Sequence, residues 1–173
     1  IFSFDGSGDY VAITKVSAEH YKKNSDGSSI WEVHTGFAIH ADKDNYLIFG
    51  IGSKDAGAIV SRKKINGALV DNGAGYLKTH GSITVGADVW LKIEKTGNIY
   101  TCSYSLDGET YTPAIENYEF ANDSARLGIY SGSTSNDHGI GGTFKTLTIT
   151  RPVKEVEIDS VSVEGDGAIS ATI

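Results

Sequence analysis

Residues 89–105 read VWLKIEKTGNIYTCSYS, and this stretch decides the fold class. Its apolar residues Val89, Leu91 and Ile93 alternate with other side chains, which is the period-two pattern of a strand with one buried face. The Thr-Gly-Asn segment that follows reads as a turn, and the residues after it alternate again. The stretch therefore predicts two antiparallel strands joined by a tight turn.

The same alternation continues outward in both directions from this hairpin. Further strands are expected at residues 10–16, 30–41, 46–51, 58–63, 125–130 and 144–149. Short turns rich in Gly, Asn and Asp separate them, and strands at this spacing are typical of a sandwich or barrel. Few stretches show a helical period, and residues 16–22 are the place where a single helical turn is expected.

Composition limits the classes of partner. The chain has 173 residues, which suits one domain with a sizeable core or one domain plus a short piece of another. Its net charge of −7 argues against nucleic acid and against an anionic membrane surface, since both attract basic proteins. Neutral polymers stay open as ligands. A lone cysteine, Cys102, excludes an internal disulfide and is expected to be a buried, inert thiol.

The organisation of the chain follows from its two ends. Arg151-Pro152 marks the end of the module, because proline is disfavoured inside a central strand. We therefore expect a β-sandwich module at residues 1–151. Residues 152–173 read as a linker followed by the opening strand of a further β-domain, or by a strand that pairs back on the sandwich. The chain opens on strand-like residues, so we expect a piece of a larger protein whose targeting signal lies upstream.

Several segments together resemble one known family. Residues 90–95 and 104–112, WLKIEK and YSLDGETYT, are similar to a recurrent hairpin of concanavalin A-like (laminin G-like) sandwich domains. Residues 36–39 with 44–47 resemble another hairpin of that family, and residues 127–132 with Phe144 and Leu147 resemble its closing strands. The resemblance covers roughly residues 8–150 and depends on the order and spacing of these pieces.

The resemblance implies an all-β fold, a two-sheet antiparallel β-sandwich of the jelly-roll, concanavalin A-like kind. Such domains are often appended to bacterial glycoside hydrolases. It therefore implies a lectin-like, non-catalytic carbohydrate-binding module of a secreted bacterial enzyme, extracellular or at the cell surface. Its partners would be a poly- or oligosaccharide and the other modules of the same polypeptide. A structural or adhesive sandwich that packs against a catalytic domain or a protein partner stays open as the alternative.

Six side chains are candidates for the sugar site. Sugars present apolar C–H faces that stack on aromatic rings, and their hydroxyls exchange hydrogen bonds with polar side chains. Strand parity places suitable side chains opposite the predicted core. The candidates are Glu32, His34, His40, Tyr46, Arg62 and Tyr130. An ordinary solvated outer sheet accounts for each of them equally well.

Catalytic and metal sites have weaker signals. Glu157-Ile158-Asp159 is similar to the carboxylate motif of sandwich glucanases, but Glu164 has the opposite strand parity and cannot complete a facing pair. Asp42 and Asp44 place oxygen ligands at a turn, where a structural calcium ion would fit, and turn chemistry alone also explains them. In relatives, an acidic residue near the last strand often helps a structural calcium site, and here Lys145-Thr146 replaces it. We therefore expect no catalytic constellation and leave calcium open.

Overall fold

The computed structural model describes residues 2–18, 33–52, 57–70, 77–121, 124–133, 142–152, 160–163 and 169–172. Every regular element among these residues is a β-strand, and no helix occurs in this part of the chain. The expected all-β class is therefore confirmed. The described residues also include no helix long and apolar enough to cross a membrane.

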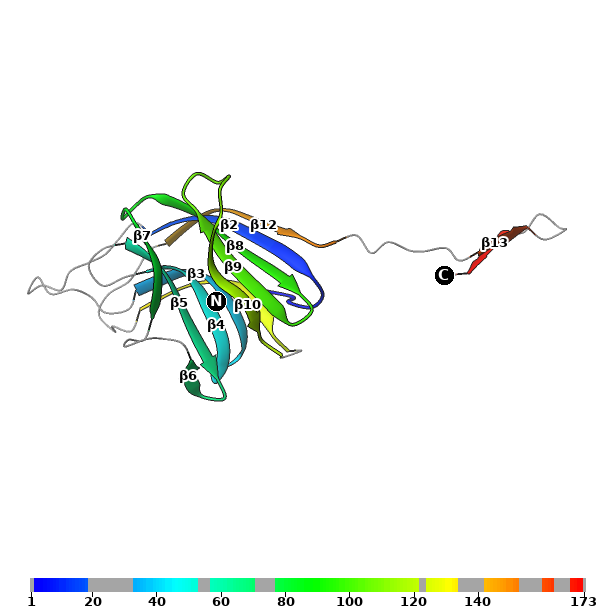
Figure 1. Cartoon of the computed structure of the whole chain (residues 1–173), viewed down its shortest axis with the longest axis horizontal. Helices are drawn as coiled ribbons and strands as arrows, with labels where there is room; N and C mark the ends of the chain where they lie inside the picture. The colour runs from blue at the N-terminus through cyan, green and yellow to red at the C-terminus, as the bar shows by residue number, and fades with distance from the viewer. Residues whose placement is uncertain are drawn as a thin grey trace, which may run out of the picture.

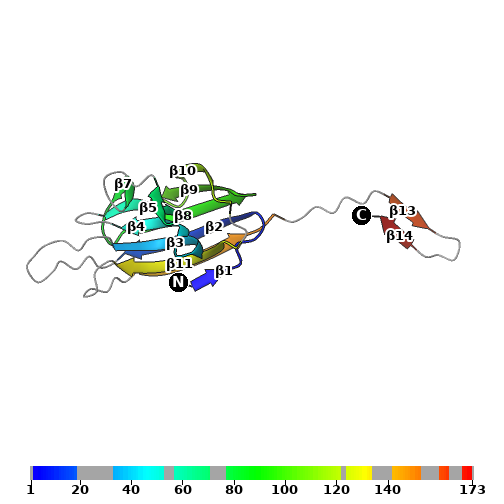
Figure 2. The same cartoon turned by 90° about the horizontal axis from the view of Figure 1, so that it is seen from below.

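Two antiparallel sheets form the body of the protein, and they stack face to face (Figures 1 and 2). The larger, sheet A, runs in the order β1-β11-β3-β4-β5-β6, with β7 also paired to β5. Its strands are β1 (Phe2–Phe4), β3 (Val33–Asp42), β4 (Asn45–Gly52), β5 (Gly57–Ile65), β6 (Ala68–Val70), β7 (Lys78–Ile83) and β11 (Arg126–Ser133). Sheet B has the order β10-β9-β8-β2-β12. Its strands are β2 (Tyr10–Ala18), β8 (Asp88–Thr96), β9 (Ile99–Ser105), β10 (Thr112–Glu119) and β12 (Gly142–Thr150).

The core lies between the two sheets and takes one face of each strand. Alternation places every second side chain inward, which is how a sandwich buries both sheets against each other. The largest side chains that are almost fully buried are Tyr10, Tyr100, Phe37, Phe49, Ile39, Leu47, Ile51, Ile59, Leu91, Ile93 and Leu127. Cys102 belongs to the same cluster, and burial raises the pKa of its thiol. The expected inert thiol therefore sits in an apolar interior.

The hairpin at residues 89–105 forms as predicted. Strands β8 and β9 pair antiparallel, with Leu91 opposite Tyr104 and Ile93 opposite Cys102. Gly97 at the turn has φ +56°, a backbone conformation that favours glycine. The backbone nitrogen of Gly97 donates a 2.8 Å hydrogen bond to Oδ1 of Asp9, which ties this turn to the segment before β2.

Four of the sandwich strands differ from the sequence prediction. Strand β2 continues through Ala18, so residues 16–18 are extended and not helical, while residues 19–22 of the expected turn lie outside the described residues. Val16 lies opposite Val89 and Phe144, and these cross-strand partners hold it in the sheet. Strands β6, β7 and β10 were not predicted. Strand β10 contains two register shifts, which break the alternation that reveals a strand.

The end of the chain forms a hairpin of its own. Strand β13 (Ser160–Val163) pairs antiparallel with β14 (Ile169–Thr172) in a separate two-stranded sheet. The string Glu157-Ile158-Asp159 lies outside the described residues. The division of the chain near residue 151 stays a prediction.

Candidate functional site

The candidate site is the face of sheet A that points away from the core. Strands β11, β3, β4 and β5 lie side by side in this sheet (Figure 2), and their register gives four cross-strand rows on this face. The rows are Gly132-His34-Gly52-Ala58, Tyr130-Gly36-Gly50-Val60, Gly128-Ala38-Ile48-Arg62 and Arg126-His40-Tyr46-Lys64. We call these sixteen positions the outer face of sheet A. Five of the six predicted sugar contacts lie on it, and Glu32 lies outside the described residues.

Glycines remove side chains from the second row. Gly36 and Gly50 are directly opposite each other on β3 and β4. A Cβ atom on Gly50 would lie 2.2 Å from the carbonyl oxygen of Thr35, and one on Gly36 would lie 2.4 Å from that of Phe49. Neither position can therefore accept a side chain without a shift of the backbone. A strip of bare backbone separates Tyr130 from Val60.

His34 and Tyr130 form the most buried polar part of the face. Their ring centroids are 5.0 Å apart, and the side chains are only 9% and 8% exposed. Burial, followed by the charge of Arg62, lowers the pKa of His34 to about 4. Burial raises the pKa of Tyr130, and Arg62 opposes that shift. The positive charge of Arg62 therefore lowers the pKa of both side chains, and both are neutral at pH 7.

Two polar atoms of this pair are buried away from solvent. Nδ1 of His34 and Oη of Tyr130 are buried, and no partner for either atom exists among the described residues. Buried polar atoms in native proteins are nearly always hydrogen-bonded, because an unpaired one carries its full desolvation cost. Either atom gains a partner only if a hydroxyl enters the space that now encloses the pair, and a neutral imidazole and a phenol can each donate to or accept from such a group.

Tyr46 and Ile48 of β4 lie beside the pair, and we call these two side chains the apolar platform. Ala38, Ile48 and Tyr130 form a small buried cluster of their own, against which Tyr46 and Leu77 pack. Tyr46 is half-buried and lies opposite His40. Parity correctly placed Tyr46 opposite the core. Ile48 shares parity with Tyr46 but was not predicted for this face, because an isoleucine reads as core in either register.

Asp42 and Asp44 are occupied by the turn between β3 and β4. Oδ1 of Asp42 accepts from the backbone nitrogen of Asp44 at 2.7 Å, and hydrogen bonds lower the pKa of Asp42. The two carboxylate oxygens of Asp44 accept from Lys43 at 2.6 Å and from Lys64 at 3.1 Å. A calcium ion would have to displace two ammonium groups, and the described residues contain no group of three metal-ligating side chains. Calcium stays an untested expectation.

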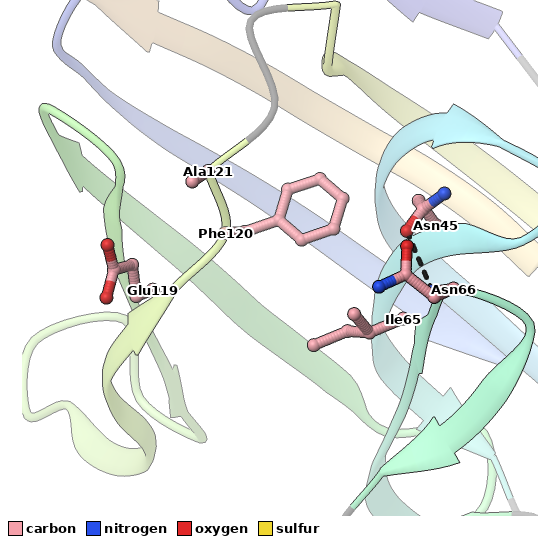
Figure 3. Close-up of a pocket in the computed structure, with 6 residues that line it drawn as sticks. All are labelled: Asn45, Ile65, Asn66, Glu119, Phe120 and Ala121. Carbon is pink, nitrogen blue, oxygen red and sulfur yellow. Dashed lines mark hydrogen bonds between the residues drawn. The ribbon is translucent and has the colours of Figure 1, made fainter.

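A hollow opens at one end of the sandwich (Figure 3). It has a volume of about 330 Å³ and is lined by Asn45, Ile65, Asn66, Glu119, Phe120 and Ala121. Oδ1 of Asn45 accepts from the backbone nitrogen of Asn66 at 2.9 Å, and Nδ2 of Asn45 donates to Asp42. The amide of Asn45 thus joins two turns. Because this amide is already hydrogen-bonded within the protein, the hollow is a weaker candidate for a ligand site than the outer face of sheet A.

The outer face of sheet B has aromatic rings that are already covered. Nζ of Lys15 lies 4.5 Å from the ring centroid of Trp90, and Nζ of Lys92 lies 4.7 Å from that of Tyr111. Gly108 also presses on Trp90, since a Cβ there would lie 2.9 Å from Cε2 of the indole. Sugar stacking on these rings would have to displace cation–π contacts. Trp90 therefore serves the turn at residues 106–110 rather than an open platform.

The buried histidine makes stability depend on pH. The pKa of His34 is about 4 in the folded protein and about 6.5 when unfolded. The unfolded chain therefore binds more protons between these values, and the free energy of unfolding falls as pH drops from 6.5 towards 4. We expect the titration of His34 to lower the free energy of unfolding by roughly 3 kcal/mol over this pH range. Urea unfolding of wild type and His34→Phe at pH 7.5 and 4.5 measures it, because phenylalanine keeps the ring and removes the proton. Equal pH dependence in both proteins would refute this assignment.

No family model matches the sequence, and no curated protein matches it. Solved structures do match the fold. A functionally unknown protein from Saccharomyces cerevisiae has a TM-score of 0.68 at 17% identity, over 87% of this chain and 74% of that one. Xylan beta-1,4-xylosidase from Bacillus halodurans has a TM-score of 0.64 at 14% identity, over 84% of this chain and 28% of the xylosidase. A human galectin-16 variant has a TM-score of 0.53 at 11% identity, over 87% of this chain and 94% of the galectin.

These likenesses concern the fold. The chain is a concanavalin- and galectin-like β-sandwich, as the sequence resemblance implied. It spans about a quarter of the xylosidase, 28% of that chain, so the same sandwich is one part of a much longer enzyme there. At identities of 11–17%, the comparison transfers no binding residue to this protein.

Proposed function

We propose that the outer face of sheet A binds a poly- or oligosaccharide, and that the chain is a non-catalytic carbohydrate-binding module of a secreted bacterial glycoside hydrolase. The observation that carries this proposal is the buried pair His34 and Tyr130. Each contains a buried polar atom without a partner among the described residues, next to the half-buried ring of Tyr46 on the same face. Sugar hydroxyls beside an apolar C–H surface complement that arrangement.

Each group on the face has a defined role in the proposal. Tyr46 and Ile48 provide the apolar platform on which a pyranose ring rests. Nδ1 of His34 and Oη of Tyr130 exchange hydrogen bonds with ring hydroxyls, and Arg62 adds charged donors at the edge of the platform. Gly36 and Gly50 contribute no side chain between Tyr130 and Val60, so the second row leaves the platform unobstructed by side chains of its own.

Two further observations support the proposal. The first supports binding rather than hydrolysis, and the second supports a place in a longer enzyme. Glycosidases of the common type need two carboxyl groups flanking the scissile bond. None of the sixteen positions on the outer face of sheet A is Asp or Glu. The second observation is the xylosidase likeness, because there the sandwich accompanies a larger chain. Secretion and bacterial origin rest on the sequence resemblance.

Retention in native affinity gels tests the proposal. Four gels contain soluble xylan, β-glucan, pectate or alginate, and a fifth contains no polysaccharide. We expect the 173-residue chain to migrate more slowly in at least one of the four than in the fifth. The retained polysaccharide should keep its chain length after overnight incubation. Unchanged migration in all four gels, together with no signal on a broad glycan array, would overturn the proposal. Shortened chains would show that the module is catalytic.

A further inference from the structure

The charges on the outer face of sheet A are one-sided. The face carries Arg62, Lys64 and Arg126 together with two histidines, and none of its sixteen positions is acidic. The whole chain has a net charge of −7, so the positive charge of this face is opposite in sign to that of the chain as a whole. On the other sheet, by contrast, Lys15 pairs with Asp88 at 2.9 Å and Lys92 with Glu94 at 2.9 Å.

The three cations differ in position and in partners. Lys64 pairs with Asp44 at 3.1 Å, at the end of the face next to the turn. Nε of Arg126 donates to Oγ of Ser3 at 3.2 Å, beside the edge strand β1. Arg62 lies in the third row next to Ile48 and is half-buried, so its charge lies beside the apolar platform.

Arg62 is suited to a carboxylate. A guanidinium has five N–H donors in a planar fork, so an interaction on one side leaves donors for a second partner. A planar carboxylate can accept two of these hydrogen bonds in parallel. His34 is neutral at pH 7 and adds no second charge to the centre of the face. One central cation matches one anionic group per bound sugar better than a densely sulfated chain, which needs several.

We propose that the glycan recognised by the outer face of sheet A is an oligosaccharide of uronic acids, with one carboxylate on Arg62. This inference rests on the proposed function and adds the charge of the ligand to it. The sugar ring lies on Tyr46 and Ile48, and its carboxylate points towards Arg62 at the β5 side of the platform. A neutral glycan of the same backbone keeps the platform and loses the charge-assisted hydrogen bonds.

Calorimetry with matched ligand pairs tests the inference. The 173-residue chain is titrated with tetragalacturonate and tetramannuronate, with the fully methyl-esterified form of each, and with a sulfated neutral tetrasaccharide. We expect one uronate to bind about 10- to 100-fold more tightly than its ester. Its affinity should fall between 50 and 500 mM NaCl, while that of the ester should change little.

Variants locate the charge. We expect Arg62→Gln to remove the preference for the acid over the ester, and Arg62→Lys to restore part of it. Lys92→Gln, on the outer face of sheet B, should leave the preference unchanged. Thermal melts of each variant show whether it folds, and the Arg62→Lys protein keeps the test valid if Arg62→Gln does not.

The outcomes separate the two proposals. Equal binding of acid and ester, or retention on xylan or β-glucan without uronate binding, overturns the inference and leaves the proposed function standing. Tighter binding of the sulfated tetrasaccharide than of either uronate also overturns it. An acid preference that survives Arg62→Gln in a folded variant overturns the role of Arg62. No binding to any glycan overturns both proposals.

Discussion

Ile93→Ala is expected to lower the free energy of unfolding by about 2–5 kcal/mol. Ile93 is 0% exposed at the centre of β8, opposite Ala12 on one side and Cys102 on the other. Removal of its side chain leaves a cavity between two sheets whose strands cannot close together without breaking register. Urea unfolding followed by tryptophan fluorescence measures the change, with Trp90 on the same strand as a reporter.

Ile99→Ala is the matched control for this substitution. Ile99 is the first residue of strand β9 in the same sheet, and it is 37% exposed. The substitution therefore removes the same atoms from a position outside the core. We expect the free energy of unfolding of this variant to stay within about 1 kcal/mol of wild type. Equal losses in the two variants would contradict the burial pattern on which the sandwich is built.

Tyr46→Ala is expected to weaken glycan binding at least about tenfold, because aromatic anchors carry most of the binding energy at such sites. Tyr46 is half-buried and packs against the cluster of Ala38, Ile48 and Tyr130 on the outer face of sheet A. Removal of the ring takes away the platform without opening the core. Calorimetry with an oligosaccharide of the polysaccharide best retained in affinity gels measures the loss.

Tyr111→Ala is the control for the binding prediction. Tyr111 is also half-buried, but Lys92 covers its ring beside the outer face of sheet B. We expect its affinity to stay within about twofold of wild type, since surface substitutions away from a site change little. A loss of binding in Tyr111→Ala with full binding in Tyr46→Ala would place the sugar on the other sheet.

Period-two patterns predicted most of the fold because each sheet of a sandwich buries one face. Strand β8 shows this directly: Val89, Leu91 and Ile93 are all 0% exposed. The same rule fails where the backbone is irregular. In β10, register shifts on either side of Ile115 and the left-handed Asn117 at φ 50° break the alternation. Strand β7 is mostly polar and none of its residues is fully buried, so it has no apolar face to reveal it.

Parity placed the candidate site residues on faces but could not assemble them. His34 and Tyr130 are 96 positions apart in sequence, and they meet only because β11 pairs with β3. That pairing is a long-range choice among strands of similar pattern, which no local signal specifies. The burial of His34 likewise depends on the neighbouring strands, so its lowered pKa could not be foreseen. The roles of these residues in binding stay predictions.

Amide chemical shifts can map the proposed binding face directly. The measurement is a ¹⁵N–¹H titration of the 18.4 kDa chain with an oligosaccharide of the best-retained polysaccharide. We predict that the amides of Gly36, Gly50 and Gly128 shift in proportion to bound ligand, while those of Trp90 and Ser103 stay in place. Shifts confined to β8 and β9, or to the hollow around Asn45 and Phe120, would contradict the assignment of the sugar site to the outer face of sheet A.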